Sequence, residues 1–262
     1  MLSLRASFLV LLLMTLFVCG CGVLHHQQPL TWHLVVEIDN SVPDIEKTTL
    51  ITKTILERRL NVIDVRDAIV RIADEKAGQI EIRLPEVADR ERLKAFLIAG
   101  GKLELVHVLG PAYPNPIKMY ADRESAELRP MEEHKAFRVL RVKEKDTDEN
   151  KWVAVETPSI ITNTDVRNAS AIPAGDGFYH VSFNLRNDGA QRFSSWTQNN
   201  INEYLGVALN DDIKSIAFIR TKLFDSGVIS GSFTKASAED LAQILMSGAF
   251  PAAIRIVEES KD

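Results

Sequence analysis

The side chains that most often do chemistry in proteins are scattered along this sequence. The six histidines are His25, His26, His33, His107, His134 and His180. Only the first two are adjacent, and they lie in a polar segment near the N-terminus. The sequence contains no H-E-x-x-H, C-x-x-C or acidic calcium loop. We therefore expect no metal site, and each histidine is expected to be a surface or sheet residue.

A glycine-serine motif at residues 227–231 comes nearest to a nucleophile motif. Two residues separate its first glycine from Ser230, whereas a nucleophile elbow has one. The glycines therefore indicate turn or bulge positions. No G-x-G-x-x-G or phosphate loop is present, so no nucleotide site is expected. We expect no cofactor, no catalytic residue and no enzymatic activity, because no spacing predicts a cluster of perturbed titratable groups.

Composition excludes other classes of protein. The 262 residues include 31 Lys and Arg against 36 Asp and Glu, which gives a net charge of −5. Hydrophobic residues make up 45% and charged residues 26%, as in ordinary globular chains. Nucleic-acid binding needs a basic face, so neither DNA nor RNA is an expected partner. After the N-terminus, no apolar run of about 20 residues predicts a membrane span.

The N-terminus predicts a cleaved, lipidated leader. Its apolar run at residues 8–18 is about half as long as a membrane-spanning helix. The run ends in Val-Cys-Gly-Cys at residues 18–21, which resembles a bacterial lipobox with Cys21 as the modified residue. We expect a lipoprotein signal peptide at residues 1–20 and a tether at residues 21–31, with the lipid on Cys21 holding the body at a membrane. An ordinary secretory peptide is the alternative.

This assignment accounts for both cysteines. Cys19 would leave with the leader and Cys21 would become a thioether, so the mature body would contain no free thiol and no disulfide. That arrangement suits an oxidising compartment. We therefore expect a lipid-anchored protein of the bacterial cell envelope, with its body in the periplasm or outside the cytoplasmic membrane.

Apolar patterning in the first half predicts the order β-α-β-β-α-β. The strands are expected at residues 32–39, 67–73, 79–84 and 102–109, and the helices from residue 44 to about 60 and at 89–99. Asp44 can cap the first helix, and Gly100 and Gly101 can end the second. Two helices on one face of an antiparallel sheet form a ferredoxin-like unit, so the expected fold class is α+β.

A proline-rich break at residues 110–116 ends this unit. Beyond the break, strands are expected at residues 137–143, 152–156, 177–185, 205–209, 213–219, 226–231 and 254–258, with the first two forming a hairpin. A helix is expected to start with Asn187 or Asp188 as its cap. A last helix is expected to open at Ser237, with Asp240 completing a capping box, and to stop at Gly248.

Short motifs in serial order resemble the SecD family. Residues 54–61, 80–87 and 89–94 are similar to a series in that family's first periplasmic domain. A longer series follows at residues 166–169, 181–185, 189–193, 229–233, 239–242, 247–252 and 257–259. No single motif is decisive, but the shared order covers most of the chain.

The resemblance implies a ferredoxin-like base that bears an inserted α+β head. It places the base at residues 32–110, the head subdomain at 111–249 and a terminal strand returning to the base at 250–262. The family's head is thought to change orientation and to touch the emerging preprotein. The candidate hinge residues are Gly110, Pro111, Phe250 and Pro251, and rigid turns at the same positions are the alternative.

The family's role implies the partners. SecD acts with SecF and uses the proton gradient to promote late steps of Sec-dependent export. The expected partners are the Sec translocon (SecY and SecD/SecF-like subunits) or an unfolded preprotein. The family, however, begins with a true membrane span and continues into a membrane bundle that holds its proton-conducting residues, whereas this sequence has a lipidation signal and stops at Asp262.

Two functions follow as hypotheses. The first is a stand-alone, lipid-anchored SecD-like domain that assists export by surface contact without catalysis. The second is a periplasmic adaptor or ligand-binding lipoprotein that keeps only the fold, since fold does not fix function. A closed apolar pocket between base and head would favour the second hypothesis.

Overall fold

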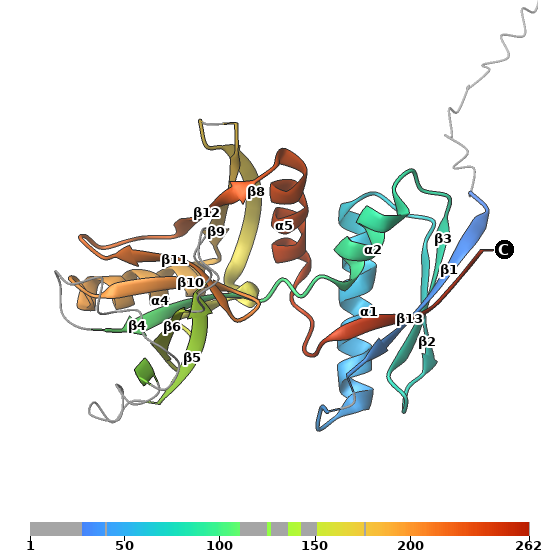
Figure 1. Cartoon of the computed structure of the whole chain (residues 1–262), viewed down its shortest axis with the longest axis horizontal. Coiled ribbons are helices and arrows are strands. Elements are labelled where there is room, and N and C mark those ends of the chain that lie inside the picture. Colours follow the sequence, from blue (N-terminus) through green and yellow to red (C-terminus); the bar gives the residue numbers. More distant parts are fainter. Residues whose placement is uncertain are drawn as a thin grey trace, which may run out of the picture.

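The computed structural model describes residues 28–39, 41–110, 125–126, 136–142, 151–175 and 177–261. These residues form two lobes side by side (Figure 1). We call them the small lobe, built on the sheet that contains both the first and the last strand, and the large lobe, built from the strands between them. The fold is a mixture of α and β, as expected. Cys21 and Pro111 lie outside the described residues.

The small lobe is a four-stranded antiparallel sheet with two helices on one face (Figure 1). Its elements are β1 (Leu30–Ile38), α1 (Ile45–Val62), β2 (Ile69–Asp74), β3 (Gln79–Pro85), α2 (Arg90–Ile98) and β13 (Ile254–Lys261). The strand order is β13-β1-β3-β2. Alternation along β1 and β3 brings one apolar side of the sheet against the helices, where it forms a core that contains Trp32, Leu34, Ile80 and Ile82.

The first helix begins where the sequence indicates. Asp44 is the N-cap of α1, and its Oδ1 accepts a hydrogen bond from the backbone N–H of Lys47 at 3.0 Å. Ile55 and Leu56 are buried. Ile51, one turn before Ile55, is 40% exposed and lines the space between the lobes.

One strand lies in a different sheet from the one expected. The strand predicted at residues 102–109 is β4 (Leu103–Leu109), and it belongs to the large lobe, not to the small sheet. All seven of its residues are buried, so it needs apolar cover on both faces. Leu105 packs into one core and Val106 into another, so both faces of β4 are covered. The small sheet has helices on one face only and could not cover both. The fourth strand of the small sheet is β13, which pairs antiparallel with β1.

The large lobe combines two sheets and two helices. Its remaining elements are β5 (Phe137–Val142), β6 (Lys151–Glu156), β7 (Ile161–Thr162), β8 (Val166–Pro173), β9 (Tyr179–Leu185), α4 (Asn187–Asn199), β10 (Tyr204–Leu209), β11 (Asp212–Phe218), β12 (Ser226–Phe233) and α5 (Lys235–Ser247). Strands β4, β10, β11, β5 and β6 pair in a closed ring, with β7 also on β4. The other sheet has the order β12-β9-β8.

Two apolar cores hold the large lobe together. One contains side chains from all five strands of the ring, so it lies inside the barrel that they form; Leu140, Val153 and Tyr204 are among its members. The other joins α4, α5 and the three-stranded sheet to the outer side of β4 and β10, and Phe183 and Phe193 are its largest buried side chains. Because β4 contributes to both cores, it is the central strand of the lobe.

Helix starts in the large lobe differ from expectation by one to three residues. The cap of α4 is Arg186, not Asn187 or Asp188. Helix α5 begins two residues before Ser237, because Thr234 is its N-cap and accepts a hydrogen bond from the backbone N–H of Ser237. The hairpin of β5 and β6 is confirmed, and so is Gly248 as the C-cap of α5.

Candidate functional site

Two described segments connect the lobes. The first crossing segment, residues 99–102, leads from α2 into β4, and the second crossing segment, residues 248–253, leads from α5 into β13. Phe250 and Pro251 lie in the second segment. Gly110 follows the far end of β4 within the large lobe, so the chain has already crossed before it reaches Gly110.

A buried arginine lies where the two crossing segments meet the small lobe. Arg59 on α1 has no exposed surface. Its Nη1 donates hydrogen bonds to the backbone carbonyls of Phe96 and Leu97 at 2.9 and 2.8 Å. Its Nη2 donates longer bonds to the carbonyls of Gly100, at 3.3 Å, and Gly248, at 3.4 Å. One guanidinium therefore contacts the last turn of α2 and both crossing segments.

Phe250 covers this guanidinium. The Cζ of Arg59 lies 4.1 Å from the centre of the Phe250 ring, a cation–π geometry. Among the described residues no carboxylate pairs with Arg59, so carbonyl dipoles and the ring supply its electrostatic stabilisation. Burial lowers the pKa of Arg59 from its ordinary value to about 9, which leaves it charged at neutral pH. The carbonyl end of α2 also favours a cation through the helix dipole.

Glycines occupy the tight positions of the crossings. Gly101 has a φ of +71°, and a Cβ added to it would lie 2.0 Å from Cγ2 of Ile244. Gly248 has a φ of +101° and ends α5. Residues with side chains adopt this region of φ at a cost. A close approach to Ile244 and a positive φ both require glycine at position 101, whereas at position 248 the positive φ alone favours it, because an added Cβ would lie 3.7 Å from Ile55.

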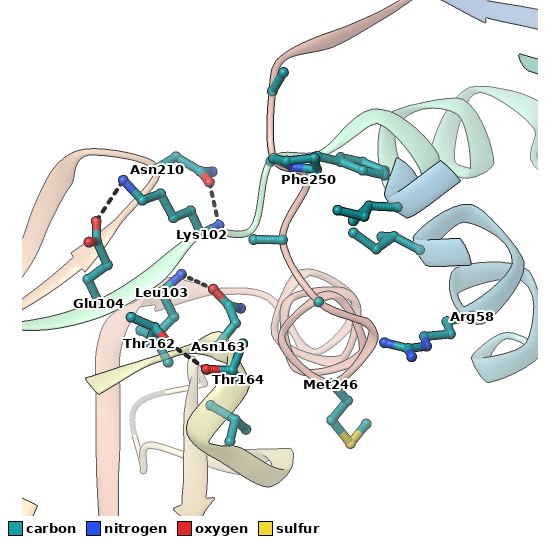
Figure 2. A pocket seen from close by; sticks show the side chains of 18 of the residues that line it. Arg58, Lys102, Leu103, Glu104, Thr162, Asn163, Thr164, Asn210, Met246 and Phe250 are labelled. Atoms are coloured by element: carbon teal, nitrogen blue, oxygen red, sulfur yellow. Dashed lines mark hydrogen bonds and ion pairs between the residues drawn. The ribbon is translucent and has the colours of Figure 1, made fainter. Parts of the chain in front are cut away.

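An open cleft of about 1090 Å³ lies between the lobes at this joint. Ile51 and Arg58 of α1 line one side of the cleft. Met246, at the end of α5, lies near Arg58 (Figure 2). The opposite wall consists of the first crossing segment, the start of β4 and the loops beside it. Met246 and Ile51 keep 42% and 40% of their surfaces exposed there. The cleft is therefore partly apolar and accessible to an extended chain.

Polar side chains fix the large-lobe wall. The Oδ1 of Asn210 accepts a hydrogen bond from the backbone N–H of Lys102 at 2.8 Å, and the Oδ1 of Asn163 accepts one from that of Leu103 at 2.7 Å (Figure 2). The two asparagine side chains thus accept hydrogen bonds from backbone N–H groups at the end of the first crossing segment and at the start of β4. They hold that segment on its large-lobe side.

Glu104 is a buried carboxylate beside the same wall, with 6% of its surface exposed. It accepts hydrogen bonds from Ser159 at 2.5 Å and from Arg138 at 2.6 Å, and pairs with Lys102 at 3.0 Å. Burial acts to raise the pKa of Glu104, but these hydrogen bonds and charges outweigh it and lower the pKa below its usual value. Glu104 is therefore ionised and structural.

The described residues contain no group of three or more His, Cys, Asp or Glu side chains placed to hold a metal ion. His107, expected in a sheet, is buried in β4 with its Nδ1 2.6 Å from Glu156 and its ring edge against Trp196. In the part of the chain that is described, no helix combines the length and apolar content needed to cross a membrane.

Arg59 is absent from the site residues expected from the sequence, although its position on α1 carries a signal. Arg59 follows Ile55 by four residues and precedes Leu60, so helical spacing places it on the buried face of α1. A charged residue on that face has to find partners inside the fold. The sequence could not show that these partners would be backbone carbonyls of residues as far apart as Phe96 and Gly248.

Comparison with known proteins supports a single family. Residues 138–252 match the family model of the SecDF P1 head subdomain. Protein translocase subunit SecD of Koribacter versatilis (strain Ellin345) is 32% identical over 204 residues, covering 78% of this chain and 37% of that protein. The SecD subunit of Aquifex aeolicus (strain VF5) is 29% identical over 181 residues, covering 69% and 33%. The chain thus spans about a third of these relatives.

Solved structures show the same fold. A SecDF structure, described as a membrane component that enhances protein export, superposes with a TM-score of 0.62 at 24% identity, covering 86% of this chain and 98% of that one. SecDF in a super-membrane-facing form gives a TM-score of 0.66 at 22% identity, covering 88% and 30%.

The class follows from the fold and its joint: a two-lobed α+β domain in which the large lobe is inserted between α2 and the last strand of the small lobe. With the matches above, the chain belongs to the SecD family. Its described residues form the first periplasmic domain of that family.

Proposed function

We propose that this domain assists Sec-dependent protein export without catalysis, by binding a translocating preprotein or the Sec channel. The observation that carries the proposal is the open cleft between two lobes, with exposed apolar side chains from both α1 and α5. A preprotein in transit is extended and exposes apolar residues, which such a cleft can cover. The SecD relatives are named as translocase subunits, and this agrees with the proposal.

The two lobes correspond to the base and head implied by the resemblance. The order β13-β1-β3-β2, all antiparallel with both helices on one face, supports the proposal of a ferredoxin-like base. On this proposal the base consists of residues 30–98 and 254–261, and the head of residues 103–247. Phe250 and Pro251 remain candidate hinge residues, now together with residues 99–102 in place of Gly110.

Photo-crosslinking in cells tests the export role. The full chain carries a photoreactive amino acid at Ile51 or at Met246, both in the cleft, or at Lys76, an exposed residue of the small lobe far along the chain from the joint. We expect an arrested preprotein or SecY to crosslink at the cleft positions more strongly than at Lys76. If neither protein crosslinks at either cleft position in cells where export is under way, the role in export is rejected.

We also propose that Cys21 carries a lipid. The lipobox-like Val-Cys-Gly-Cys at residues 18–21 supports this. Cells grown with a radiolabelled fatty acid should label the wild-type chain and Cys19→Ser, but not Cys21→Ser. Equal labelling of the wild type and Cys21→Ser would refute the anchor.

The alternative, a ligand-binding lipoprotein, needs a closed apolar pocket between base and head. The cleft in the structure is open and its lining mixes apolar with polar and charged side chains, among them Arg58, Lys102 and Arg186. This favours a macromolecular partner over a small apolar ligand, because small-molecule pockets enclose most of the ligand surface.

A further inference from the structure

Arg59 makes two kinds of bond. Those to Phe96 and Leu97 stay within the small lobe and are short, at 2.9 and 2.8 Å. Those to Gly100 and Gly248 reach the crossing segments and are longer, at 3.3 and 3.4 Å. Since hydrogen bonds weaken with distance, the guanidinium is held more firmly by α2 than by the joint.

The second crossing segment adds a separate contact. Gly248 gives its carbonyl to Arg59, and Phe250, two residues later, covers the guanidinium with its ring at 4.1 Å. Residues far apart in the chain therefore meet at one side chain. If the second crossing segment moved away, Arg59 would keep its α2 partners, and its charge would not be left without hydrogen bonds.

Two further contacts between described residues join the lobes. Ile244 of α5 is buried in the core of the small lobe, an apolar contact that carries little directional preference, because the hydrophobic effect is non-directional. Arg92 of α2 pairs with Asp240 of α5 at 2.8 and 3.0 Å, but Arg92 is half-exposed, and exposed pairs contribute little. Gly101 and Gly248 have positive φ values, and because glycine has no Cβ, the backbone at these points has freedom that other residues lack. A joint of this kind needs an additional restraint to keep one orientation.

We propose that Arg59 is a latch: anchored on the carbonyl end of α2, it holds both crossing segments, with Phe250 as its cover, and so fixes the orientation of the large lobe on the small lobe. This inference concerns the domain itself and does not depend on the export role. Arg59 is a positioning residue. The second crossing segment is the part of the joint that can move away while Arg59 keeps its bonds to α2.

The test measures the distance between the lobes in the full chain. Nitroxide labels are attached to cysteines at Lys76 in the small lobe and Ser230 in the large lobe, both exposed, after Cys19 and Cys21 are replaced by serine. Double electron–electron resonance then gives the distribution of label separations. The variants are Arg59→Met, Arg59→Lys and Phe250→Ala, and the control is Arg58→Met, an exposed arginine one position away.

We expect one narrow distribution for the unsubstituted chain and for Arg58→Met. Arg59→Met should broaden the distribution at least twofold, and Phe250→Ala should broaden it less, because the carbonyl bonds remain. Arg59→Lys keeps the charge but has fewer donors, so an intermediate width is expected. Circular dichroism and the thermal midpoint are measured on every sample.

A purely structural role for Arg59, as a cap on α2, predicts a different result: a lower thermal midpoint with an unchanged distance distribution. That result in folded Arg59→Met overturns the latch. If Arg59→Met does not fold, Phe250→Ala and Arg59→Lys decide the matter, and unchanged distributions in both of these variants overturn it as well.

Discussion

Glu104 shows how single residues stabilise the wall of the joint. It is nearly fully buried, yet its carboxylate is satisfied by a hydroxyl, a guanidinium and an ammonium group. A buried charge costs free energy unless it is paired in this way. The lowered pKa of Glu104 records that the folded state favours the ionised form.

We predict that the effect of Glu104→Gln depends on pH. The folded-state pKa lies below 4.5, so the stabilisation is fully present above that pH and is lost as the pH falls through the folded-state pKa. At pH 7 the variant should be less stable by about 1–3 kcal/mol. Urea unfolding over a range of pH checks this, and a difference that stays constant into the acid range would contradict the assignment.

Gly101 offers a second prediction at this scale. Gly101→Ala should destabilise the chain by about 2–4 kcal/mol, since it adds strain at φ +71° to a Cβ contact of 2.0 Å with Ile244. Gly175→Ala is the matched control, because its φ is +92° with no atom within 4 Å of the added Cβ. If both variants lose the same stability in denaturant unfolding, the contact with Ile244 contributes nothing.

At the scale of elements, the last strand completes a sheet begun by the first. β13 pairs with β1 from Trp32 to Ile38, and Ile254 and Ile256 pack on the core of the small lobe. The indole N–H of Trp32 also donates to Glu259 at 3.1 Å. The small lobe therefore depends on residues at both ends of the described chain.

Deleting residues 254–262 should loosen the small lobe and leave the large lobe folded. Hydrogen exchange, followed by mass spectrometry, should become faster in β1, which loses its β13 partners, and stay slow in β4 and β10. Arg255→Ala is the control, because it removes only an exposed ion pair with Glu37 and should change stability by less than about 1 kcal/mol. Unchanged exchange in β1 would show that β13 is dispensable.

Most elements could be predicted from local pattern, and their placement could not. Period-2 alternation in β3 and the Asp44 cap of α1 mark those elements without tertiary information. The strand at β4 was also predictable, but not its sheet, because a run of residues cannot specify which of two cores will cover it. The prolines after Gly110 predict a joint there, whereas the chain crosses between the lobes about ten residues earlier, at residues 99–102.

At the scale of the whole molecule, in the part that the structure describes, apolar and charged side chains connect the lobes, and Ile244 of α5 is buried in the core of the small lobe. Arg92 and Asp240 form a bidentate pair between α2 and α5, and Arg59 contacts the crossing segments. The Arg92–Asp240 pair is open to solvent and ions, whereas the contacts of Arg59 are buried. Their contributions should therefore respond differently to salt.

A double-mutant cycle with Arg92→Ala and Asp240→Ala should give a coupling energy of about 0.2–1 kcal/mol at low salt. The coupling should decrease toward zero in about 1 M salt, where the screening length is about 3 Å. Urea unfolding of the four chains at two salt concentrations provides the measurement. A coupling that salt does not reduce would mean that this pair is shielded from solvent.

The α+β class, most of the strands and helices, and the family resemblance could be predicted from the sequence, because alternation, caps and motif order are local properties of the chain. Three features required the folded structure: which strand closes the small sheet, where the lobes join and what Arg59 binds. These features depend on contacts between residues as distant in the chain as Arg59 and Gly248, which local sequence patterns cannot specify.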